Sequence, residues 1–427
     1  MISTGRLALY ALPALPLALP VLPAAVLLPA HYAGTLGLGL GAVALALTAA
    51  RALDVVTDPL VGALSDRSGV RKPWIAAGAV LAGVALVRLF DPPTGAGAWH
   101  LFGWSVLLYL GWTLVQVPYQ AWGADMDPGY HQRARIAGWR EGVGVLGLLA
   151  AGALSTLGLP AVAWAAVILG GPAVALALWR VPEASTVPAT PVTRHALRAI
   201  AGNGPFRRLL AAWVLNGVAA GVPAVLFPFF IGHGLAAADR VGVFLLLYFL
   251  AAVAAVPGWL WLARRVDKHR AWCIAMAAAC AAFAPVPLLG PGDGGWFALV
   301  CVVTGAALGA DLALPPAMQA DVIDYGALRA GGARRTGLYM ALWTMGTKGA
   351  LALSVATALP LAAAFGFDPR AAVQPPGALA ALALLYAGLP TAAKLGAVAL
   401  VWGYPLTERR HAAIRRRLDR RTQGVPP

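Results

Sequence analysis

Charged residues are scarce in this chain. Only 11% of its 427 residues are charged, whereas 60% are apolar, and the mean hydropathy is +0.75. A soluble protein of this size needs roughly a quarter of its residues charged to cover its surface, so the composition excludes a soluble globular protein. At about 20 residues per span plus short loops, the chain has room for about twelve transmembrane helices.

Cysteine and acidic residues are also few. The three cysteines, Cys273, Cys280 and Cys301, lie in apolar stretches, which is typical of small core residues and indicates neither a disulfide framework nor a metal site. Only 17 acidic residues oppose 32 basic ones, giving a formal net charge of +15. The arginines are spread over short segments between apolar runs, as the positive-inside rule predicts, so no nucleic-acid partner is expected.

Sequence patterns for catalysis or nucleotide binding are lacking. The glycines are scattered through apolar stretches and form no phosphate-cradling loop. The seven histidines show no ligand spacing, and no Ser/His/Asp arrangement is apparent. We therefore expect no enzyme and no cofactor other than a coupling ion, Na⁺ or H⁺.

What the chain does have is a series of long apolar runs, rich in the glycine and proline that transmembrane helices tolerate. Spans are expected at about 7–29, 38–63, 75–92, 100–122, 138–159, 161–179, 209–231, 240–262, 271–290, 296–318, 336–361 and 379–403. The longest polar stretch divides them into two halves. The predicted domains are a six-helix bundle at 1–180, a cytoplasmic linker at 181–208, a second six-helix bundle at 209–404 and a basic cytoplasmic tail at 405–427.

The basic residues mark one side of the membrane. They follow the even-numbered spans, lie in the central linker and crowd the tail, whereas the opposite loops offer little beyond Arg240 and Arg370. The positive-inside rule predicts that this side and both termini are cytoplasmic, in a plasma (inner) membrane. A similar pattern of acidic and basic residues follows the second and the eighth spans, which favours a repeat-built transporter.

The second predicted span carries Arg51, Asp54 and Asp58. An ionisable side chain at mid-membrane costs roughly 2.5–3.5 kcal/mol on insertion scales. Spacings of three and four residues place all three on one helical face, with Thr57 adjacent. Two carboxylates one turn apart repel unless they share a cation or a proton. The pattern predicts a site for Na⁺ or H⁺; the alternative is a structural pair neutralised by Arg51 and a partner helix.

Lys348 lies inside the eleventh predicted span. A buried lysine needs a carboxylate partner, and the Asp54–Asp58 pair in the other half is a candidate. Such a link would respond to cation binding, which coupling requires. The alternative is a lysine that extends from a helix end to the membrane interface.

The fourth span offers polar groups for a substrate. Thr113 and Gln116 share one face, and Tyr119, Gln120 and Trp122 lie towards its cytoplasmic end.

Two charged residues elsewhere are further substrate candidates. Arg140 lies at the start of the fifth span. Asp311, inside the tenth, has no local partner in the sequence and is expected either to contact substrate or to pair with a neighbouring arginine.

Two groups of charges flank the spans on the predicted cytoplasmic side. We expect them to act as a gating latch between helices; the alternative is that they only set topology. They are Asp66, Arg67, Arg71 and Lys72 in the first half, and Asp321, Asp324, Arg334 and Arg335 in the second.

Four segments resemble the glycoside–pentoside–hexuronide:cation symporter family of the major facilitator superfamily, and the resemblance covers the whole chain in outline. The first segment is residues 50–59, continuing to Gly62, Asp66 and residues 72–74. The second is Val117-Pro118-Tyr119, the third is residues 320–326, and the fourth is Thr344-Met345 with Lys348-Gly349.

The resemblance implies a cation site built from Asp54 and Asp58, with Thr57 and Thr113 as neighbouring ligands. It also implies that Lys348 links this site to the second half and that Arg140 bears on sugar recognition or gating. Thr57 stands where the family has an asparagine.

The sugar site departs from the family pattern of the melibiose carrier. Ala18 and Gln116 replace sugar-binding aspartates, and Gln120 replaces a stacking tryptophan. Gln116 and Gln120 can still hydrogen-bond to hydroxyl groups, and Trp122 or Tyr119 is expected to stack.

Together these features predict an all-α membrane protein with the major facilitator fold, twelve transmembrane helices in two pseudo-symmetric six-helix bundles. The predicted function is cation-coupled symport of a sugar, glycoside or related small organic solute by alternating access, by a monomer surrounded by lipid. The alternatives are a carrier of lysolipid or another amphiphile, and an uncoupled uniporter of the same fold.

Overall fold

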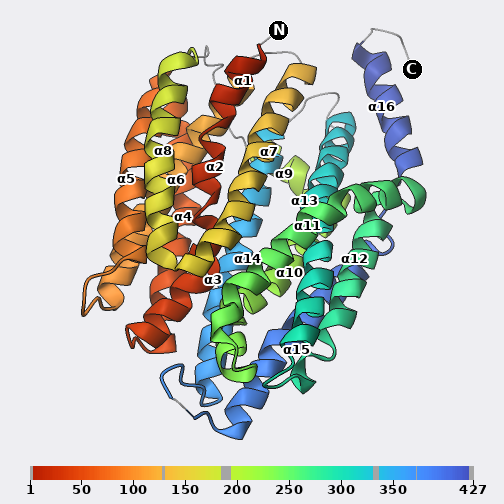
Figure 1. The fold of residues 1–427 in the computed structure, drawn as a ribbon. Coiled ribbons are helices and arrows are strands. Elements are labelled where there is room, and N and C mark those ends of the chain that lie inside the picture. The colour runs from red at the N-terminus through yellow and green to blue at the C-terminus, as the bar shows by residue number, and fades with distance from the viewer. Residues whose placement is uncertain (1–2, 127–129, 184–193, 330–335, 372, 423–427) are drawn as a thin grey trace. The chain divides into compact units, whose positions relative to one another are not determined.

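The structure is a computed structural model that describes residues 3–126, 130–183, 194–329, 336–371 and 373–422. Every regular element within these ranges is a helix (Figure 1). Twelve helical segments among them are long and apolar enough to cross a membrane. The all-α membrane fold predicted from composition is confirmed.

The first six spans follow one another along residues 4–180. They are formed by α1 (Thr4–Ala11), α2 (Ala14–Ala18), α3 (Val21–Ala30) and η1 (His31–Thr35); α4 (Leu40–Ser68); α5 (Lys72–Phe90); α6 (Ala98–Asp125); α7 (Tyr130–Leu154) with η2 (Ser155–Leu157); and α8 (Leu159–Arg180).

The other six spans follow a short helix, α9 (Arg194–Ala201). They are formed by α10 (Gly204–Phe229) with η3 (Phe230–Gly234); η4 (Ala238–Arg240) with α11 (Val241–Val266); α12 (Lys268–Phe283) with η5 (Val286–Leu288); α13 (Gly294–Arg329); α14 (Thr336–Ala364); and α15 (Pro376–Val401). A last helix, α16 (Glu408–Thr422), occupies the tail.

Proline divides the first span into short helices. Pro13 lies just before α2, and Pro20 lies just before α3. Proline has no backbone N–H and its ring clashes with the preceding turn, so a continuous helix is interrupted there. The proline-rich first span of the sequence is therefore a broken helix.

The first and the seventh spans end in the same way, which supports the predicted repeat. Both close with a π-helical turn, in which Leu36 N–H bonds to His31 O and Leu235 N–H bonds to Phe230 O, each at 3.1 Å. The next hydrogen bond is also shared, since Leu38 N–H bonds to Tyr32 O at 2.9 Å and Ala237 N–H bonds to Ile231 O at 3.0 Å.

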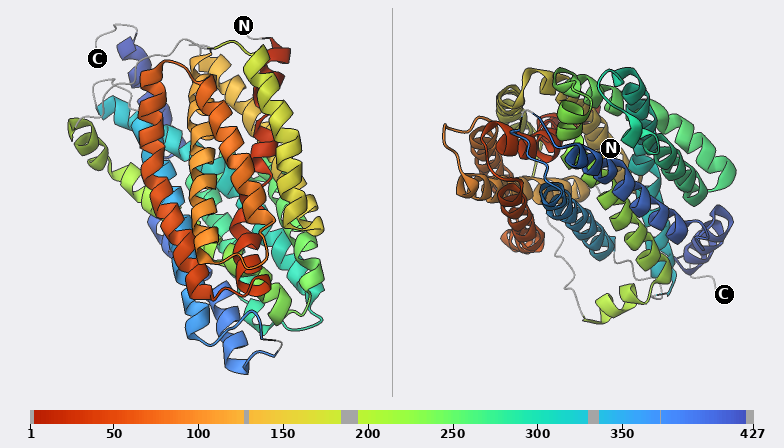
Figure 2. Two further views of the ribbon diagram at one scale, coloured as in Figure 1. Left: turned by 90° about the vertical axis from the view of Figure 1, so that its left-hand side faces the viewer. Right: turned by 90° about the horizontal axis from the view of Figure 1, so that it is seen from below.

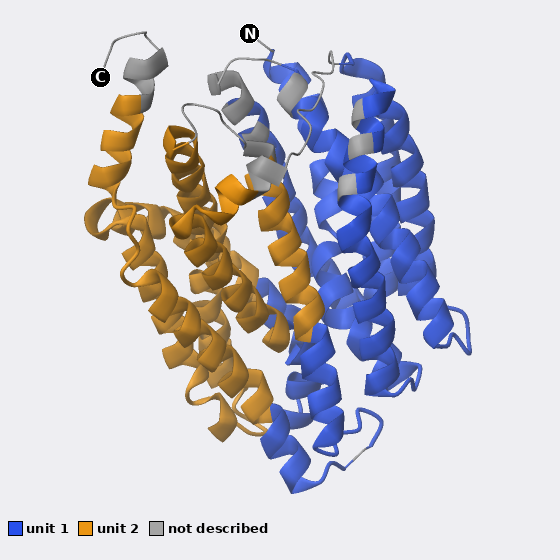
Figure 3. Ribbon diagram, turned by 180° about the vertical axis from the view of Figure 1, so that it is seen from behind, with its two compact units in different colours: residues 1–190, 224–246, 355–382 blue, residues 191–223, 247–354, 383–427 orange. Residues whose placement is uncertain are grey.

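The described contacts divide the chain into two compact units (Figure 3). Unit 1 consists of Met1–Thr190, Ala224–Leu246 and Val355–Leu382, and unit 2 of Pro191–Pro223, Leu247–Ser354 and Ala383–Pro427. Residues of the second half thus pack within unit 1; for example, Arg370 Nη1 donates to Gly37 O at 3.2 Å. The domain boundaries taken from the polar linker remain predictions.

Close packing in unit 1 positions the acidic second span. The long helix α6 packs against both α4 and α5 (Figure 2). A Cβ added to Gly78 on α5 would lie 2.7 Å from the Gly111 carbonyl of α6, so only glycine permits this approach. Thr113 lies two residues beyond Gly111, on a different face of α6, and this face contacts α4.

Candidate functional site

The predicted cation site is assembled from α4 and α6. Thr113 Oγ1 lies 3.1 Å from Asp54 Oδ1 and 2.6 Å from Asp58 Oδ1. Asp54 is only 5% exposed and Thr113 is buried, while Asp58 is partly buried. The structure therefore brings together two carboxylates and one hydroxyl in the interior of unit 1.

Two neighbours on α4 take other positions. Thr57 Oγ1 donates to the Asp54 backbone carbonyl at 3.0 Å, so its hydrogen is engaged while its oxygen retains acceptor capacity. The Arg51 guanidinium carbon lies 4.6 Å from the centre of the Tyr109 ring, a cation–π contact. The predicted roles of Thr57 as a cation ligand and of Arg51 in coupling remain predictions.

Three of the predicted substrate residues keep accessible polar groups. Gln120 is exposed and Gln116 is partly exposed. Gln120 Nε2 donates to Gln116 Oε1 at 3.4 Å across one helical turn of α6. Arg140 on α7 pairs with Glu141 at 2.6 Å and also interacts with Tyr10.

The predicted stacking role of Tyr119 and Trp122 needs correction. These rings are 2% and 1% exposed. Each ring also has its polar atom engaged, because Tyr119 Oη bonds to Tyr10 O and Trp122 Nε1 donates to Pro182 O at 3.0 Å. A solute cannot stack on rings held in the core of unit 1, so they act in packing.

Asp311 also differs from the expectation. Its partner is a lysine and not an arginine: Lys394 Nζ of α15 lies 3.9 Å from Asp311 Oδ2. Trp272 Nε1 of α12 donates to Asp311 Oδ1 at 2.6 Å. Because Asp311 is only 7% exposed and both carboxylate oxygens face protein groups, the structure argues against direct contact with a solute.

Lys348 lies on α14 in unit 2, whereas Asp54 and Asp58 belong to unit 1. The preceding residue, Thr347, accepts a hydrogen bond from Trp213 Nε1 at 2.7 Å. The predicted link between Lys348 and the acidic pair remains a prediction.

In the first half, the gating group centres on Arg71, which is buried after α4. Its Nη1 donates to Ser65 Oγ at 3.0 Å, and its backbone N–H donates to Glu183 Oε1 at 2.7 Å. Lys72 Nζ lies 5.6 Å from the Trp122 ring, and Arg67 is exposed. Glu183, which follows α8, thus joins the end of the sixth span to the start of the third.

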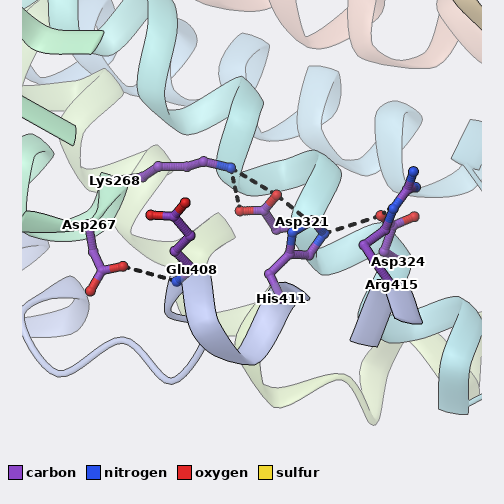
Figure 4. Close-up of polar contacts among 7 residues, drawn as sticks. All are labelled: Asp267, Lys268, Asp321, Asp324, Glu408, His411 and Arg415. Carbon is purple, nitrogen blue, oxygen red and sulfur yellow. Dashed lines mark hydrogen bonds and ion pairs between the residues drawn. The ribbon is translucent and has the colours of Figure 1, made fainter. Parts of the chain in front are cut away.

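In the second half, the predicted gating acids of α13 contact three basic side chains among the described residues (Figure 4). Lys268 Nζ lies 2.7 Å from Asp321 Oδ2, and His411 Nε2 of α16 lies 3.5 Å from Asp321 Oδ1. Asp324 Oδ2 lies 3.2 Å from both His411 Nε2 and Arg415 Nη1. The tail helix is thereby attached to the tenth span.

Neighbouring groups extend this contact. The Glu408 backbone N–H donates to Asp267 Oδ1 at 2.9 Å at the start of α16 (Figure 4). Burial, with a smaller contribution from the charge of Asp321, raises the pKa of Tyr404 above its ordinary value. Tyr404 therefore stays neutral beside the acids.

Some predicted gating residues cannot be placed. Arg334 and Arg335 lie outside the described residues, as does the side chain of Asp66.

No role was predicted from the sequence for six residues that contact the predicted site residues or their partners. They are Trp272, Lys394, Glu183, His411, Arg415 and Asn216, which accepts a hydrogen bond from Lys394 Nζ at 2.6 Å. Of these, Lys394 had a sequence signal, since it is a lone charge inside an apolar span.

Comparison with known proteins places the chain among transporters. A family model described as MFS/sugar transport protein matches residues 9–408. The putative glycoside/cation symporter YagG of Escherichia coli (strain K12) is 27% identical over 439 residues, covering 93% of this chain and 91% of YagG. The uncharacterized symporter sll1374 of Synechocystis sp. is 22% identical over 481 residues, covering 87% and 88% of the two chains.

A solved structure agrees with the fold. A mutant of the nucleoside transporter NupG superposes with a TM-score of 0.71 at 13% identity, covering 92% of this chain and 99% of that one. At this identity the likeness concerns the fold alone. Because the family model matches nearly the whole length of the chain, the chain belongs to the MFS/sugar transport protein family. It is an integral membrane transporter and not an enzyme.

Proposed function

We propose that this transporter couples the movement of a small organic solute to a cation, Na⁺ or H⁺, held by Asp54 and Asp58. The observation that carries the proposal is the position of Thr113, whose one hydroxyl lies within hydrogen-bond distance of both carboxylates. Carboxylate and hydroxyl oxygens are hard ligands of the kind that hard cations prefer.

Counting hydrogens supports this reading. The Thr113 hydroxyl has one hydrogen, so it can donate to only one of the two carboxylates at a time. The second contact becomes favourable when the other carboxyl is protonated and donates to Thr113, or when a cation lies among the oxygens. The three groups are therefore suited to hold one additional positive charge.

The coupling follows from repulsion between the acids. Without a cation, two carboxylates that face one hydroxyl in a low-dielectric interior repel each other. A cation removes that repulsion and lets α4 and α6 pack closely. We propose that the carrier changes its accessible side only when it is empty or when it holds both cation and solute, with Lys348 transmitting the change to the second half.

The proposed solute is a sugar, a glycoside or a related polar molecule. Gln116 and Gln120 offer amide groups to hydroxyls on an accessible face of α6, and Arg140 offers a partly buried guanidinium. The glycoside in the name of the related YagG supports the same class. We also propose that the protein works as a monomer.

The test is Asp58→Asn, with Asp54→Asn beside it, in proteoliposomes. Asparagine keeps the shape of the side chain but removes its charge. In the wild type we expect ²²Na⁺ to bind or, for H⁺ coupling, a pH gradient to drive uptake of a sugar selected by a thermal-shift screen. In the variants, gradient-driven accumulation should be lost while solute exchange survives.

The same assay separates the alternatives. Unchanged accumulation in both variants would remove the coupling assignment. Wild-type uptake that ignores both Na⁺ and pH would indicate a uniporter. Competition by lysolipids and not by sugars would indicate an amphiphile carrier.

The orientation is proposed as well: the basic ends of the even-numbered spans, and both termini, face the cytoplasm. A green fluorescent protein fused after residue 427 should fluoresce in cells. An alkaline phosphatase fusion at the same place should be inactive; the opposite pair of results would reverse the orientation.

A further inference from the structure

A second group of charged and polar side chains is buried in unit 2. Asp311 on α13 and Lys394 on α15 are only 7% and 5% exposed. Asn216 on α10 and Trp272 on α12 are also buried and complete the group. Four helices therefore meet at what we term the Asp311–Lys394 cluster.

Each charge in the cluster has a neutral partner that lies closer than its counter-charge. Lys394 Nζ donates to Asn216 Oδ1 at 2.6 Å, and Trp272 Nε1 donates to Asp311 Oδ1 at 2.6 Å. The two charged groups approach only to 3.9 Å. Both side chains thus have a short hydrogen bond of their own, and the ion pair is the loosest contact in the cluster.

A loose, buried ion pair is a poor structural link. Removing two charges from water is expensive, and the attraction between them compensates only when their geometry is close and their other bonds are made. Ionisable residues kept at membrane depth commonly belong to ion paths and proton relays. The distance of 3.9 Å therefore favours a pair that opens over one that only fastens two helices.

The backbone at Asp311 is also a weak point of α13. Pro315 follows four residues later, at the position whose N–H would normally bond to the Asp311 carbonyl. Proline has no N–H, so that helical hydrogen bond is missing, and Pro316 removes the bond to Leu312 in the same way. Helices bend at such sites, so α13 lacks two helical hydrogen bonds beside Asp311.

The surroundings restrict what can bind to Asp311. Its burial excludes a solute, which would need the helices to separate. The Lys394 ammonium beside it repels Na⁺. A proton needs no additional space and can pass along hydrogen bonds, so it is the ligand that fits.

We propose that Asp311 is a proton-binding site of this transporter, separate from the proposed cation site of unit 1, and that its protonation breaks the ion pair with Lys394 and loosens α13 from α15. One proton from solution adds to the carboxylate, forming one O–H bond and a neutral carboxylic acid. Lys394 keeps its charge and its hydrogen bond to Asn216. When the proton leaves, the ion pair forms again.

The other titratable groups near the cluster are not expected to take up this proton. Tyr248 on α11 interacts electrostatically with Asp311, and Cys280 on α12 with Lys394. Tyrosine and cysteine side chains are mostly neutral near pH 7. The contacts of α16 with α13 are made further along, at Asp321 and Asp324.

Infrared difference spectroscopy of the full chain in lipid vesicles tests the proposal directly. Acidification from about pH 8 to about pH 5 should produce the carbonyl band of a newly protonated carboxylic acid. This band should be missing in Asp311→Asn. In Lys394→Met it should appear at a pH higher by about one unit or more, because the cation that favours the carboxylate is gone.

A more conservative variant tests the proposal if Asp311→Asn does not fold. Trp272→Phe removes the indole hydrogen bond to Asp311 and should shift the frequency of the band. Trp259→Phe is the matched control, since Trp259 Nε1 donates to the Ala306 carbonyl, and it should leave the band in place. An Asp311→Asn spectrum identical to wild type, or no shift in Trp272→Phe, would overturn the proposal.

The result does not depend on the cation site of unit 1. The band should persist in an Asp54→Asn/Asp58→Asn variant if Asp311 is the carboxylate that takes up the proton. Disappearance of the band in that variant alone would assign the proton to Asp54 or Asp58 instead, and would leave the proposed function standing.

Discussion

Both halves of the chain bury a carboxylate deep within a span, but they surround it differently. On α4, Asp54 and Asp58 face the single hydroxyl of Thr113. On α13, Asp311 faces an indole N–H and a lysine. The first group gathers two negative charges around one hydroxyl, while the second already contains a positive charge of its own.

The difference suggests two kinds of ion chemistry in one carrier. In the proposed function, the pair of carboxylates on α4 takes up a cation from solution, either Na⁺ or H⁺. An acid beside a lysine has its counter-charge in place, so only a proton on the acid changes its state. Variants that remove one partner at a time can test this contrast.

The largest expected effect is at the Asp311–Lys394 cluster. Lys394→Met leaves the buried Asp311 without its counter-charge, which should lower stability by about 3–5 kcal/mol. Thermal unfolding in detergent measures it. The loss should be greatest at alkaline pH and shrink on acidification, because protonation removes the uncompensated charge.

The matched control for this change is the Asp311→Asn/Lys394→Met double variant. It has no buried charge at the cluster, so most of the lost stability should return. If the double variant were as unstable as Lys394→Met, the two residues would not act as a pair.

An intermediate effect is expected at the proposed cation site. Thr113→Val keeps the shape of the side chain but removes the hydroxyl between Asp54 and Asp58. A hydrogen bond to a charged group contributes about 1.5–3 kcal/mol, so binding of ²²Na⁺ should weaken by about tenfold or more. For H⁺ coupling, the pH dependence of uptake should shift instead.

Thr57→Val is the matched control, because it makes the same substitution at the neighbouring threonine. The Thr57 hydroxyl donates to the Asp54 backbone carbonyl, so its loss should change cation affinity much less than the loss of Thr113. Equal effects would give both threonines the same role as ligands. A larger effect for Thr57 would contradict the central position of Thr113.

The smallest effect is expected at the contact between Asp324 of α13 and Arg415 of α16. Arg415 is 39% exposed where it pairs with Asp324, and water and salt screen such pairs. Arg415→Ala should lower the stability by less than about 1 kcal/mol, and high salt should reduce the difference. Thermal unfolding at two salt concentrations measures it, with exposed Arg416→Ala as control.

Most of the fold was predictable from residue types. Apolar runs of the length of a membrane predicted the twelve spans, and the four family-like segments predicted the transporter family. The acidic residues of α4 were predictable as a group, since Asp54 and Asp58 lie one helical turn apart. Their closeness to Thr113 followed from resemblance and not from spacing, because Thr113 is on a different helix.

Sequence reasoning failed where the partner lay on a distant segment. It expected Asp311 either to contact substrate or to pair with an arginine, whereas the structure places Lys394 of α15 beside it. It expected Tyr119 and Trp122 to face a solute, but their neighbours Tyr10 and Pro182 keep them in the core. It grouped the α13 acids with Arg334 and Arg335, which lie outside the described residues, and it did not anticipate the contacts of these acids with Lys268, His411 and Arg415.

The sequence by itself determined that this chain spans a membrane and where its helices run. Those properties follow from hydrophobicity and local spacing, which each segment carries on its own. Only the tertiary structure decided that Thr113 lies between two acids, that Lys394 faces Asp311 and that the tail helix contacts α13. The reason is physical: which helices approach each other depends on close packing at positions such as Gly78. The sequence of one segment does not specify which other segments pack against it.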